Sequence, residues 1–286
     1  MLQPEISIID SHVHLWDPRR FKMGWIKGSE QLDRSYQLDD YSEHIRGLPV
    51  EGFVFVEAGL DSGNELEEVE WVAGLARRDA RLKGIVAAAP VEQGEALRPF
   101  LEKLVEISPL VKGVRRLLQG EADPYYCLQP DFIRGVQLLS QFGLSFDICI
   151  KHIQLPGVIE LVRRCPQTSF ILDHIAKPAI KQAELDPWRE NIHELASLPN
   201  VVCKISGLVT EADHQHWQAV ELAPYVAHIL ESFGEERVMF GSDWPVILLA
   251  TAYSRWVETL NHLTSHLSDE ARQRLWATNA KKYYQL

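Results

Sequence analysis

The chain has 286 residues, of which 46% are hydrophobic and 24% are charged. This composition is that of a globular protein and excludes a disordered chain. The formal net charge of −11 disfavours nucleic acid and anionic membrane surfaces as partners.

Other features of the sequence bear on its location. The opening residues, MLQPEISIID, carry no basic flank and no long apolar segment, so we expect no signal peptide. No stretch approaches the roughly 18 apolar residues of a membrane span. The four cysteines are scattered without a CxxC pair, which indicates buried free thiols and a cytoplasmic protein.

Short apolar runs rich in Val, Ile and Phe recur along the whole chain and predict strands. Their nearly continuous apolar character is typical of strands buried on both faces, as in parallel sheets. The eight predicted strands are 6–16, 52–58, 82–90, 111–118, 144–151, 168–177, 200–208 and 237–245.

Segments with apolar residues at spacings of three and four separate these runs and predict helices. The expected helices are 65–80, 95–107, 131–142, 155–165, 187–198, 223–234, 253–267 and 268–286. This alternation predicts a parallel sheet, and eight units predict a closed (β/α)₈ barrel, an α/β fold, in one domain spanning 1–286. A doubly wound open sheet is the rival, but its G-x-G-x-x-G motif is absent. The long connection 17–38 is expected to be functional or a lid.

Polar residues end seven of the eight predicted strands. In a barrel of this kind the active site lies at the C-terminal ends of the strands. Because charged groups are not buried without partners, we expect these side chains to meet at one mouth and to bind a metal or a substrate. They are His12, His14, Glu57, Arg115, Arg116, Lys151, His152, Asp173, His174, Lys204, Ser206, Ser242, Asp243 and Trp244.

The H-x-H pair at the end of the first strand is the clearest candidate for chemistry. Side chains two apart on a strand face the same way, so His12 and His14 should point together into the barrel, with Asp10 one layer below. Both imidazoles could then bind one metal ion. His174 and Asp243 join them as catalytic candidates, with Asp243 as general base or metal ligand and otherwise a helix cap.

The remaining candidates follow from their places in the pattern. Glu57 is a further candidate metal ligand or a structural residue. Arg115 and Arg116 are adjacent, so one faces the lumen and the other the helices, and the same holds for Lys151 and His152. These four are candidate substrate-binding residues, whereas Lys204 is expected to pack the barrel mouth. Trp25 and Trp244 are apolar walls or platforms for a sugar ring.

Six segments, in this order, resemble the amidohydrolase superfamily: IDSHVHLWDP, VKGVRRLLQ, DICIKHIQLP, FILDHIAKP, CKISGLVTEAD and MFGSDWP. The likeness is closest to its amidohydrolase 2 branch of sugar-acid and dicarboxylate lactonases, the group of the L-fuconolactonases and L-rhamnonolactonases. It extends from about residue 6 to the closing NAKKYY.

The resemblance implies a (β/α)₈ barrel that hydrolyses a ring ester, with Asp243 as the base on water. It implies that His12, His14 and His174 are the lumen histidines. It also implies a single divalent metal, such as zinc, or none, because the carboxylated-lysine pattern that accompanies a second metal is absent.

The expected substrate is therefore a small molecule, a sugar-acid lactone such as L-fucono- or L-rhamnonolactone. One alternative is a metal-dependent decarboxylase of the same superfamily. A second is a non-enzymatic binding protein for sugar acids, because a fold does not by itself define an activity. The stereochemistry of the sugar and the oligomeric state stay open.

Overall fold

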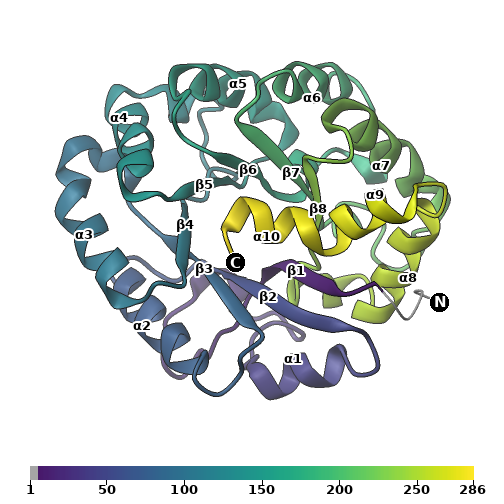
Figure 1. Ribbon diagram of the computed structural model, residues 1–286, viewed down its shortest axis with the longest axis horizontal. Coiled ribbons are helices and arrows are strands. Elements are labelled where there is room, and N and C mark those ends of the chain that lie inside the picture. Colours follow the sequence, from purple (N-terminus) through teal and green to yellow (C-terminus); the bar gives the residue numbers. More distant parts are fainter. Residues whose placement is uncertain (1–5) are drawn as a thin grey trace.

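Eight parallel strands form a ring in which each strand pairs with the next along the chain (Figure 1). The computed structural model describes residues 6–286; residues 1–5, part of the segment from which we expect no signal peptide, lie outside it. A bridge between Val13 and Trp244 and a hydrogen bond from Asp243 N to His12 O (2.9 Å) close the barrel. The strands are β1 (Ile8–Val13), β2 (Val50–Val56), β3 (Leu82–Ala88), β4 (Val111–Arg115), β5 (Ser145–Ile148), β6 (Phe170–Leu172), β7 (Val201–Ile205) and β8 (Val238–Phe240).

Helices surround the ring and connect successive strands (Figure 1). They are α1 (Leu38–His44), α2 (Glu65–Leu75), α3 (Arg98–Ile107), α4 (Pro130–Leu139), α5 (Leu155–Arg164), α6 (Trp188–Ala196), α7 (Ala219–Phe233), α8 (Tyr253–Leu263), α9 (Asp269–Gln273) and α10 (Asn279–Tyr284). The predicted (β/α)₈ barrel is therefore confirmed. The sequence patterns did not indicate α1, which begins where the Asp40 carboxylate accepts the N–H of Gln37 at 2.9 Å. Within residues 6–286, every helix is too short or too polar to cross a membrane.

β6 and β8, which precede the site residues His174 and Asp243, end earlier than the apolar runs predict. β6 stops at Leu172 because His174 to Lys177 all adopt positive φ angles, from 47° to 63°. Left-handed backbone cannot continue a strand. Asp243, with φ 62°, likewise lies beyond the end of β8 at Phe240. These turns lift His174 and Asp243 out of the strand ladder at the barrel mouth.

A bulge in β1 changes which side chains face the lumen. The pairing of β1 with β2 shifts register between Asp10 and Val13. His12 and His14 both point inward, as expected, but the prediction that Asp10 lies below them in the lumen is wrong. The Asp10 carboxylate accepts hydrogen bonds from Tyr41 of α1 and Tyr253 of α8, at 3.2 and 3.0 Å, outside the ring. The extra residue of a bulge reverses the alternation of faces beyond it.

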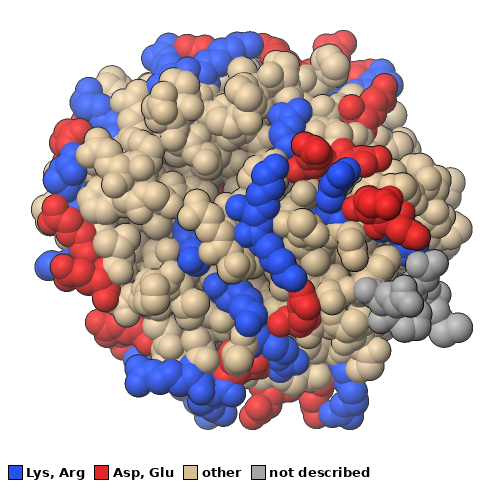
Figure 2. Space-filling model, in the orientation of Figure 1, with Lys and Arg blue, Asp and Glu red and all other residues tan. Residues whose placement is uncertain are grey.

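The lumen is apolar toward the N-terminal ends of the strands. The side chains that fill it there are Ile9, Val54, Val56, Val86, Ile171, Val202 and Met239. Ala280 and Tyr284 of α10 pack against this layer, and Asn279 fixes the helix by donating to the carbonyl of Val238 at 2.7 Å. α10 therefore closes this end of the barrel (Figure 1). Figure 2 shows side chains covering the same face, with Lys and Arg across its middle.

Candidate active site

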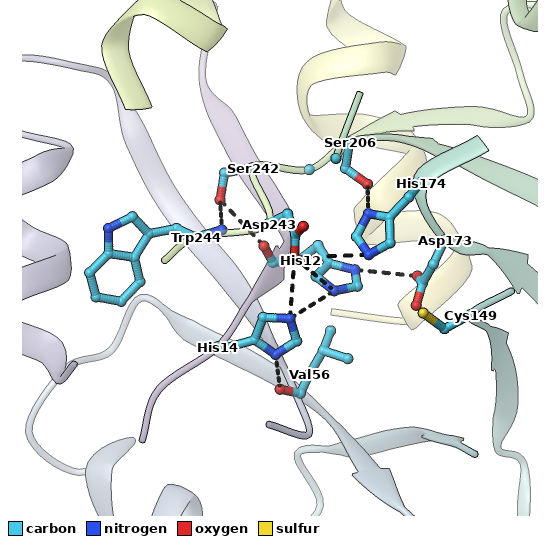
Figure 3. Close-up of polar contacts among 12 residues, drawn as sticks. His12, His14, Val56, Cys149, Asp173, His174, Ser206, Ser242, Asp243 and Trp244 are labelled. Carbon is cyan, nitrogen blue, oxygen red and sulfur yellow. Dashed lines mark hydrogen bonds and ion pairs between the residues drawn. The ribbon is translucent and has the colours of Figure 1, made fainter. Parts of the chain in front are cut away.

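Three imidazoles and one carboxylate meet at the C-terminal end of the barrel (Figure 3). His12 and His14 come from the end of β1, His174 follows β6, and Asp243 follows β8. His12 Nε2 lies 3.1 Å from His14 Nε2. Asp243 Oδ1 lies 3.3, 3.7 and 3.9 Å from the Nε2 atoms of His14, His12 and His174. The structure thus brings together, in buried positions, the four residues that we expect to be catalytic.

The hydrogen bonding of His14 directs a lone pair into this cluster. His14 Nδ1 lies 2.8 Å from the carbonyl oxygen of Val56, and a carbonyl only accepts, so this nitrogen carries the proton. In the neutral ring, His14 Nε2 then carries a lone pair that faces the carboxylate of Asp243. Two acceptors at 3.3 Å require a proton or a metal ion between them.

This donor set fits a divalent metal. His12, His14 and Asp243 each offer one ligand atom, and these atoms lie within 4.8 Å of one another. Two imidazole nitrogens and a carboxylate oxygen are ligands that zinc and similar ions accept. His12, Asp173 and His174 form a second such group that shares His12. The cluster can therefore hold a divalent ion.

The residues after β6 and β7 determine the position of His174. Its Nδ1 lies 2.9 Å from Ser206 Oγ. Gly207, with φ 65°, packs so closely that a Cβ there would lie 2.6 Å from the same nitrogen. The run of left-handed residues from His174 to Lys177 includes the β-branched Ile175, for which this conformation is unfavourable. Backbone strain of this kind is typical of functional sites.

Burial and neighbouring charges set the ionisation of the cluster. Burial lowers the pKa of His12 well below its ordinary value, although the charge of Asp173 opposes this. Burial also lowers the pKa of His174 to about 4. Burial alone would raise the pKa of Asp243, but His174, His14 and His12 pull it below its ordinary value. At neutral pH the site therefore contains an ionised carboxylate beside the neutral rings of His12 and His174.

Between the histidines and the apolar layer lies a buried network of charges. Lys204 Nζ lies 2.7 Å from Asp147 Oδ2, 2.9 Å from Asp173 Oδ1 and 3.2 Å from His12 Nδ1. Burial would lower the pKa of Lys204, but Asp147 and Asp173 raise it, so the ammonium stays charged. Asp173 Oδ1 also lies 3.3 Å from His12 Nδ1. Lys204 therefore does more than pack the barrel mouth, because it also contacts His12, a catalytic candidate.

Of the two adjacent arginines, Arg115 faces the lumen. Its Nη1 lies 3.1 Å from Asp173 Oδ2 and 3.3 Å from His12 Nε2, and its Nε donates to Glu57 Oε1 at 2.6 Å. The other oxygen of Glu57 accepts the N–H of Gly59 at 2.7 Å. Glu57 therefore holds Arg115 in place, and it is in neither group of candidate metal ligands found among residues 6–286.

Two of the expected substrate-binding residues lie away from the cluster. Arg116 faces outward and pairs with Glu92 and Glu121, at 3.2 and 2.7 Å. Trp244 is fully buried, and its ring centroid lies 5.2 Å from that of Tyr41 in α1. Figure 3 shows this indole directed away from the histidines. The structure therefore does not bring Arg116 or Trp244 to the catalytic candidates.

Loops after β5, β6 and β7 enclose a hollow of about 820 Å³ at the same end of the barrel. The prediction that only one of Lys151 and His152 faces the site is wrong: both line this hollow, together with Lys177 and Glu211. They lie beyond the end of β5 at Ile148, where strand alternation no longer holds. Lys177 Nζ lies 3.9 Å from Glu211, and Asp243 helps to raise the pKa of Lys177 against the opposing effect of burial. Lys177 therefore links the hollow electrostatically to the carboxylate of the cluster.

The long connection 17–38 folds against the end of β2. Trp25 donates from Nε1 to the carbonyl of Ala58 at 2.9 Å, and its ring centroid lies 5.6 Å from that of Trp16. The side chain of Trp25 is 49% exposed. The connection thus places an accessible indole next to Ala58, the residue that follows Glu57.

Asp147 and Tyr284 belong to the buried network, yet the pattern of polar residues at strand ends predicts neither. Asp147 stands alone in the apolar strand SFDI, and a lone carboxylate in a buried strand signals a partner. Tyr284 donates a hydrogen bond to Asp147 Oδ2. The segment NAKKYYQL gives no sign that this phenol enters the lumen.

The fold and the site together define a class of protein. Imidazoles from one strand of a (β/α)₈ barrel meet a carboxylate from another at the C-terminal mouth, where barrel enzymes place their chemistry. A family model described as Amidohydrolase matches residues 9–286. The chain therefore belongs to the amidohydrolase family and is a hydrolytic enzyme, as its sequence motifs predict.

Relatives with names match almost the whole chain. An L-fucono-1,5-lactonase from Burkholderia multivorans is 35% identical over 302 residues, covering 97% of this chain and 96% of that protein. An L-rhamnono-gamma-lactonase from Scheffersomyces stipitis is 24% identical over 339 residues, covering 98% and 99%. A crystal structure of a Burkholderia multivorans amidohydrolase with bound zinc superposes with a TM-score of 0.87 at 32% identity, covering 98% of this chain and 99% of that one.

Proposed function

We propose that this protein is a lactonase that opens a sugar-acid lactone, such as an L-fucono- or L-rhamnonolactone, by attack of water on the ring ester. The observation that carries the proposal is the buried carboxylate of Asp243 beside the imidazoles of His12, His14 and His174. The names of the relatives, L-fucono-1,5-lactonase and L-rhamnono-gamma-lactonase, support the substrate class.

In this proposal Asp243 is the general base. Its carboxylate takes a proton from a water molecule, and the oxygen of that water attacks the lactone carbonyl carbon. The bond from that carbon to the ring oxygen then breaks, and the proton passes from Asp243 to the leaving oxygen. Arg115, 3.3 Å from His12, supplies positive charge on the side where the carbonyl oxygen becomes negative.

His12, His14 and Asp243 are the residues that would hold a divalent ion, and zinc is the ion we propose. Bound there, such an ion supplies Lewis-acid polarisation of the carbonyl and lowers the pKa of water. The contact of His14 with the Val56 carbonyl is the kind of second hydrogen bond that orients a metal-binding imidazole. The relative solved with bound zinc supports this choice.

The hydroxylated part of the lactone is proposed to occupy the hollow beside the cluster. Its lining by Lys151, His152 and Lys177 offers donors for sugar hydroxyls and for the carboxylate that ring opening creates. The exposed indole of Trp25 offers an apolar face for the sugar ring. Arg116 and Trp244 lie outside the proposed substrate site, because Arg116 pairs with Glu92 and Glu121 and the Trp244 ring packs on Tyr41.

The proposal is tested with a panel of sugar lactones and a pH indicator, because each ring opening releases an acid. The wild-type protein should hydrolyse at least one L-fucono- or L-rhamnonolactone. Asp243→Asn should lower kcat by about 10²- to 10⁴-fold, since that is the usual contribution of a general base. Asp269→Asn, which removes an exposed carboxylate on α9, is the matched control and should retain full activity.

Two other outcomes would replace the proposal. Release of carbon dioxide without ring opening would favour the metal-dependent decarboxylase. Binding of sugar acids without turnover would favour the binding protein. Full activity of Asp243→Asn would remove that residue from its role as base. A cytoplasmic location, one domain over 1–286 and the absence of nucleic-acid partners remain parts of this proposal.

A further inference from the structure

A chain of buried polar contacts links the C-terminal helix to His12. Tyr284 OH donates to Asp147 Oδ2, and Lys204 Nζ donates to the same oxygen at 2.7 Å. Lys204 Nζ then lies 3.2 Å from His12 Nδ1. All four side chains are buried. A phenol at the N-terminal end of the barrel is thus three contacts away from a catalytic imidazole at the other end.

Lys204 and Asp173 favour different tautomers of His12. An ammonium only donates, so Lys204 beside Nδ1 favours the tautomer with the ring proton on Nε2. That tautomer leaves no lone pair on Nε2 for a divalent ion or for Arg115 Nη1, a donor 3.3 Å away. A carboxylate only accepts, so Asp173 Oδ1, 3.3 Å from the same Nδ1, favours a proton on Nδ1, which leaves the Nε2 lone pair free for Arg115 or a divalent ion. An ammonium held on Asp147, away from Nδ1, therefore favours the tautomer that the site needs.

Asp147 and Tyr284 determine where that ammonium lies. The contact with Asp147, at 2.7 Å, is the shortest that Lys204 makes. Asp147 lies on β5, whereas His12 lies on β1. The phenol ring of Tyr284 lies under the ammonium, 5.3 Å from Nζ to the ring centroid. Ser145 Oγ, at 3.3 Å from Asp147 Oδ1, contacts the other oxygen, so the hydroxyl of Tyr284 is the neutral donor on the oxygen that Lys204 uses.

We propose that Tyr284 is a positioning residue of the active site. Its hydroxyl holds Asp147, Asp147 holds Lys204, and the position of Lys204 lets His12 keep its proton on Nδ1 and present the Nε2 lone pair to the site. The C-terminal helix is then a functional part of the catalytic centre and not only the closure of the barrel. The proposal deepens the lactonase proposal and rests on it for its kinetic readout.

The test compares two neighbouring tyrosines. Tyr284→Phe keeps the ring in the lumen and removes only the hydroxyl. Tyr283→Phe is the matched control, because Tyr283 is the neighbouring residue of α10. Its hydroxyl donates to the carbonyl of Glu236 at 3.0 Å and does not enter the buried network. We expect Tyr284→Phe to lower kcat about tenfold, the lower end of losses from outer contacts of catalytic ligands, with KM changed by less than about twofold. The control should match the wild type.

A spectroscopic readout keeps the proposal separate from turnover. Spectra of protein labelled with ¹⁵N-histidine distinguish a protonated ring nitrogen from an unprotonated one. We expect the His12 nitrogen signals to shift in Tyr284→Phe and to stay in place in Tyr283→Phe. If the wild type hydrolyses no lactone, the lactonase proposal fails and this comparison alone decides the role of Tyr284.

A double variant tests the route. Tyr284→Phe combined with Asp147→Asn should be no slower than Asp147→Asn alone, because both changes act on one chain of contacts. Unchanged His12 signals in Tyr284→Phe would overturn the proposal, whatever happens to kcat. A lower melting temperature with unchanged kcat and unchanged His12 signals would assign Tyr284 a structural role only.

Discussion

At the scale of single residues, the position of His174 depends on the absence of a side chain at Gly207. A Cβ there would lie 2.6 Å from His174 Nδ1 and 2.8 Å from its Cγ, so the ring must move if alanine is introduced. We expect Gly207→Ala to lower kcat about 10²-fold, because displacing a catalytic group by about 1 Å has effects of that size. Steady-state kinetics on the best lactone of the panel measure it.

Gly143→Ala separates this clash from the cost of the backbone conformation. Gly143 has φ 67° and ψ 23°, in the left-handed region and close to the φ of 65° at Gly207, but nothing lies within 4 Å of its Cβ position. Both variants should lose about 1–2 kcal/mol of stability from a left-handed alanine, and only Gly207→Ala should lose activity. Equal activities of the two variants would show that His174 tolerates the displacement.

The residues of the cluster differ in how far the sequence predicts them. His12, His14, His174 and Asp243 stand at strand ends, where the barrel rule makes polar side chains visible. Tyr284 is the last residue of α10. Its hydroxyl reaches the network only because α10 folds across the end of the barrel. Contacts between segments so distant in sequence leave no local pattern in either segment.

At the scale of elements, turns and bulges account for what periodicity could not predict. The alternation rule assumes a regular strand. The register shift between Asp10 and Val13 breaks it, so the rule predicts the wrong face of the sheet for Asp10. The same rule could not choose between Arg115 and Arg116, because a shift of one residue exchanges them. Apolar runs predicted the strands themselves well, since burial on both faces leaves little choice of residue.

Helix α2 contributes a carboxyl group that should make stability depend on pH. Glu68 is buried and accepts the N–H of Ala58 at 3.0 Å. Burial, and next the charge of Glu57, raise its pKa well above the usual 4.5. The folded protein therefore holds this proton more tightly than the unfolded chain. The associated stability is present at low pH and is lost as pH rises from about 4.5 through the folded-state pKa.

Glu68→Gln removes this titration and keeps the acceptor for Ala58. We expect the variant to gain stability relative to the wild type as pH rises from 5 to 8, by about 1.4 kcal/mol for each unit of pKa difference between the two states. Urea unfolding at a series of pH values measures the gain. Glu67→Gln, on the exposed face of the same helix, should show no such trend. A constant difference across pH would contradict a raised pKa at Glu68.

At the scale of the whole molecule, the barrel mouth gathers more negative than positive charge. The buried network contains four carboxylates, Glu57, Asp147, Asp173 and Asp243, and two cations, Arg115 and Lys204. This network thus contains two more carboxyl groups than cations, while Lys177 pairs with Glu211. Buried charge without a partner is costly, so a divalent ion between His12, His14 and Asp243 should stabilise the fold.

Removal and return of metal therefore test the whole arrangement. After treatment with a chelator, Zn²⁺ at 100 times its dissociation constant should stabilise the protein by about 2.7 kcal/mol, which raises the melting temperature by several degrees. Mg²⁺ should have little effect, because it prefers six oxygen ligands. Asp243→Asn should reduce the response, since it removes a ligand and the negative charge of that carboxylate. If Zn²⁺ changes neither the melting temperature nor lactone turnover of chelator-treated protein, the histidines work without a metal and must stabilise the oxyanion themselves.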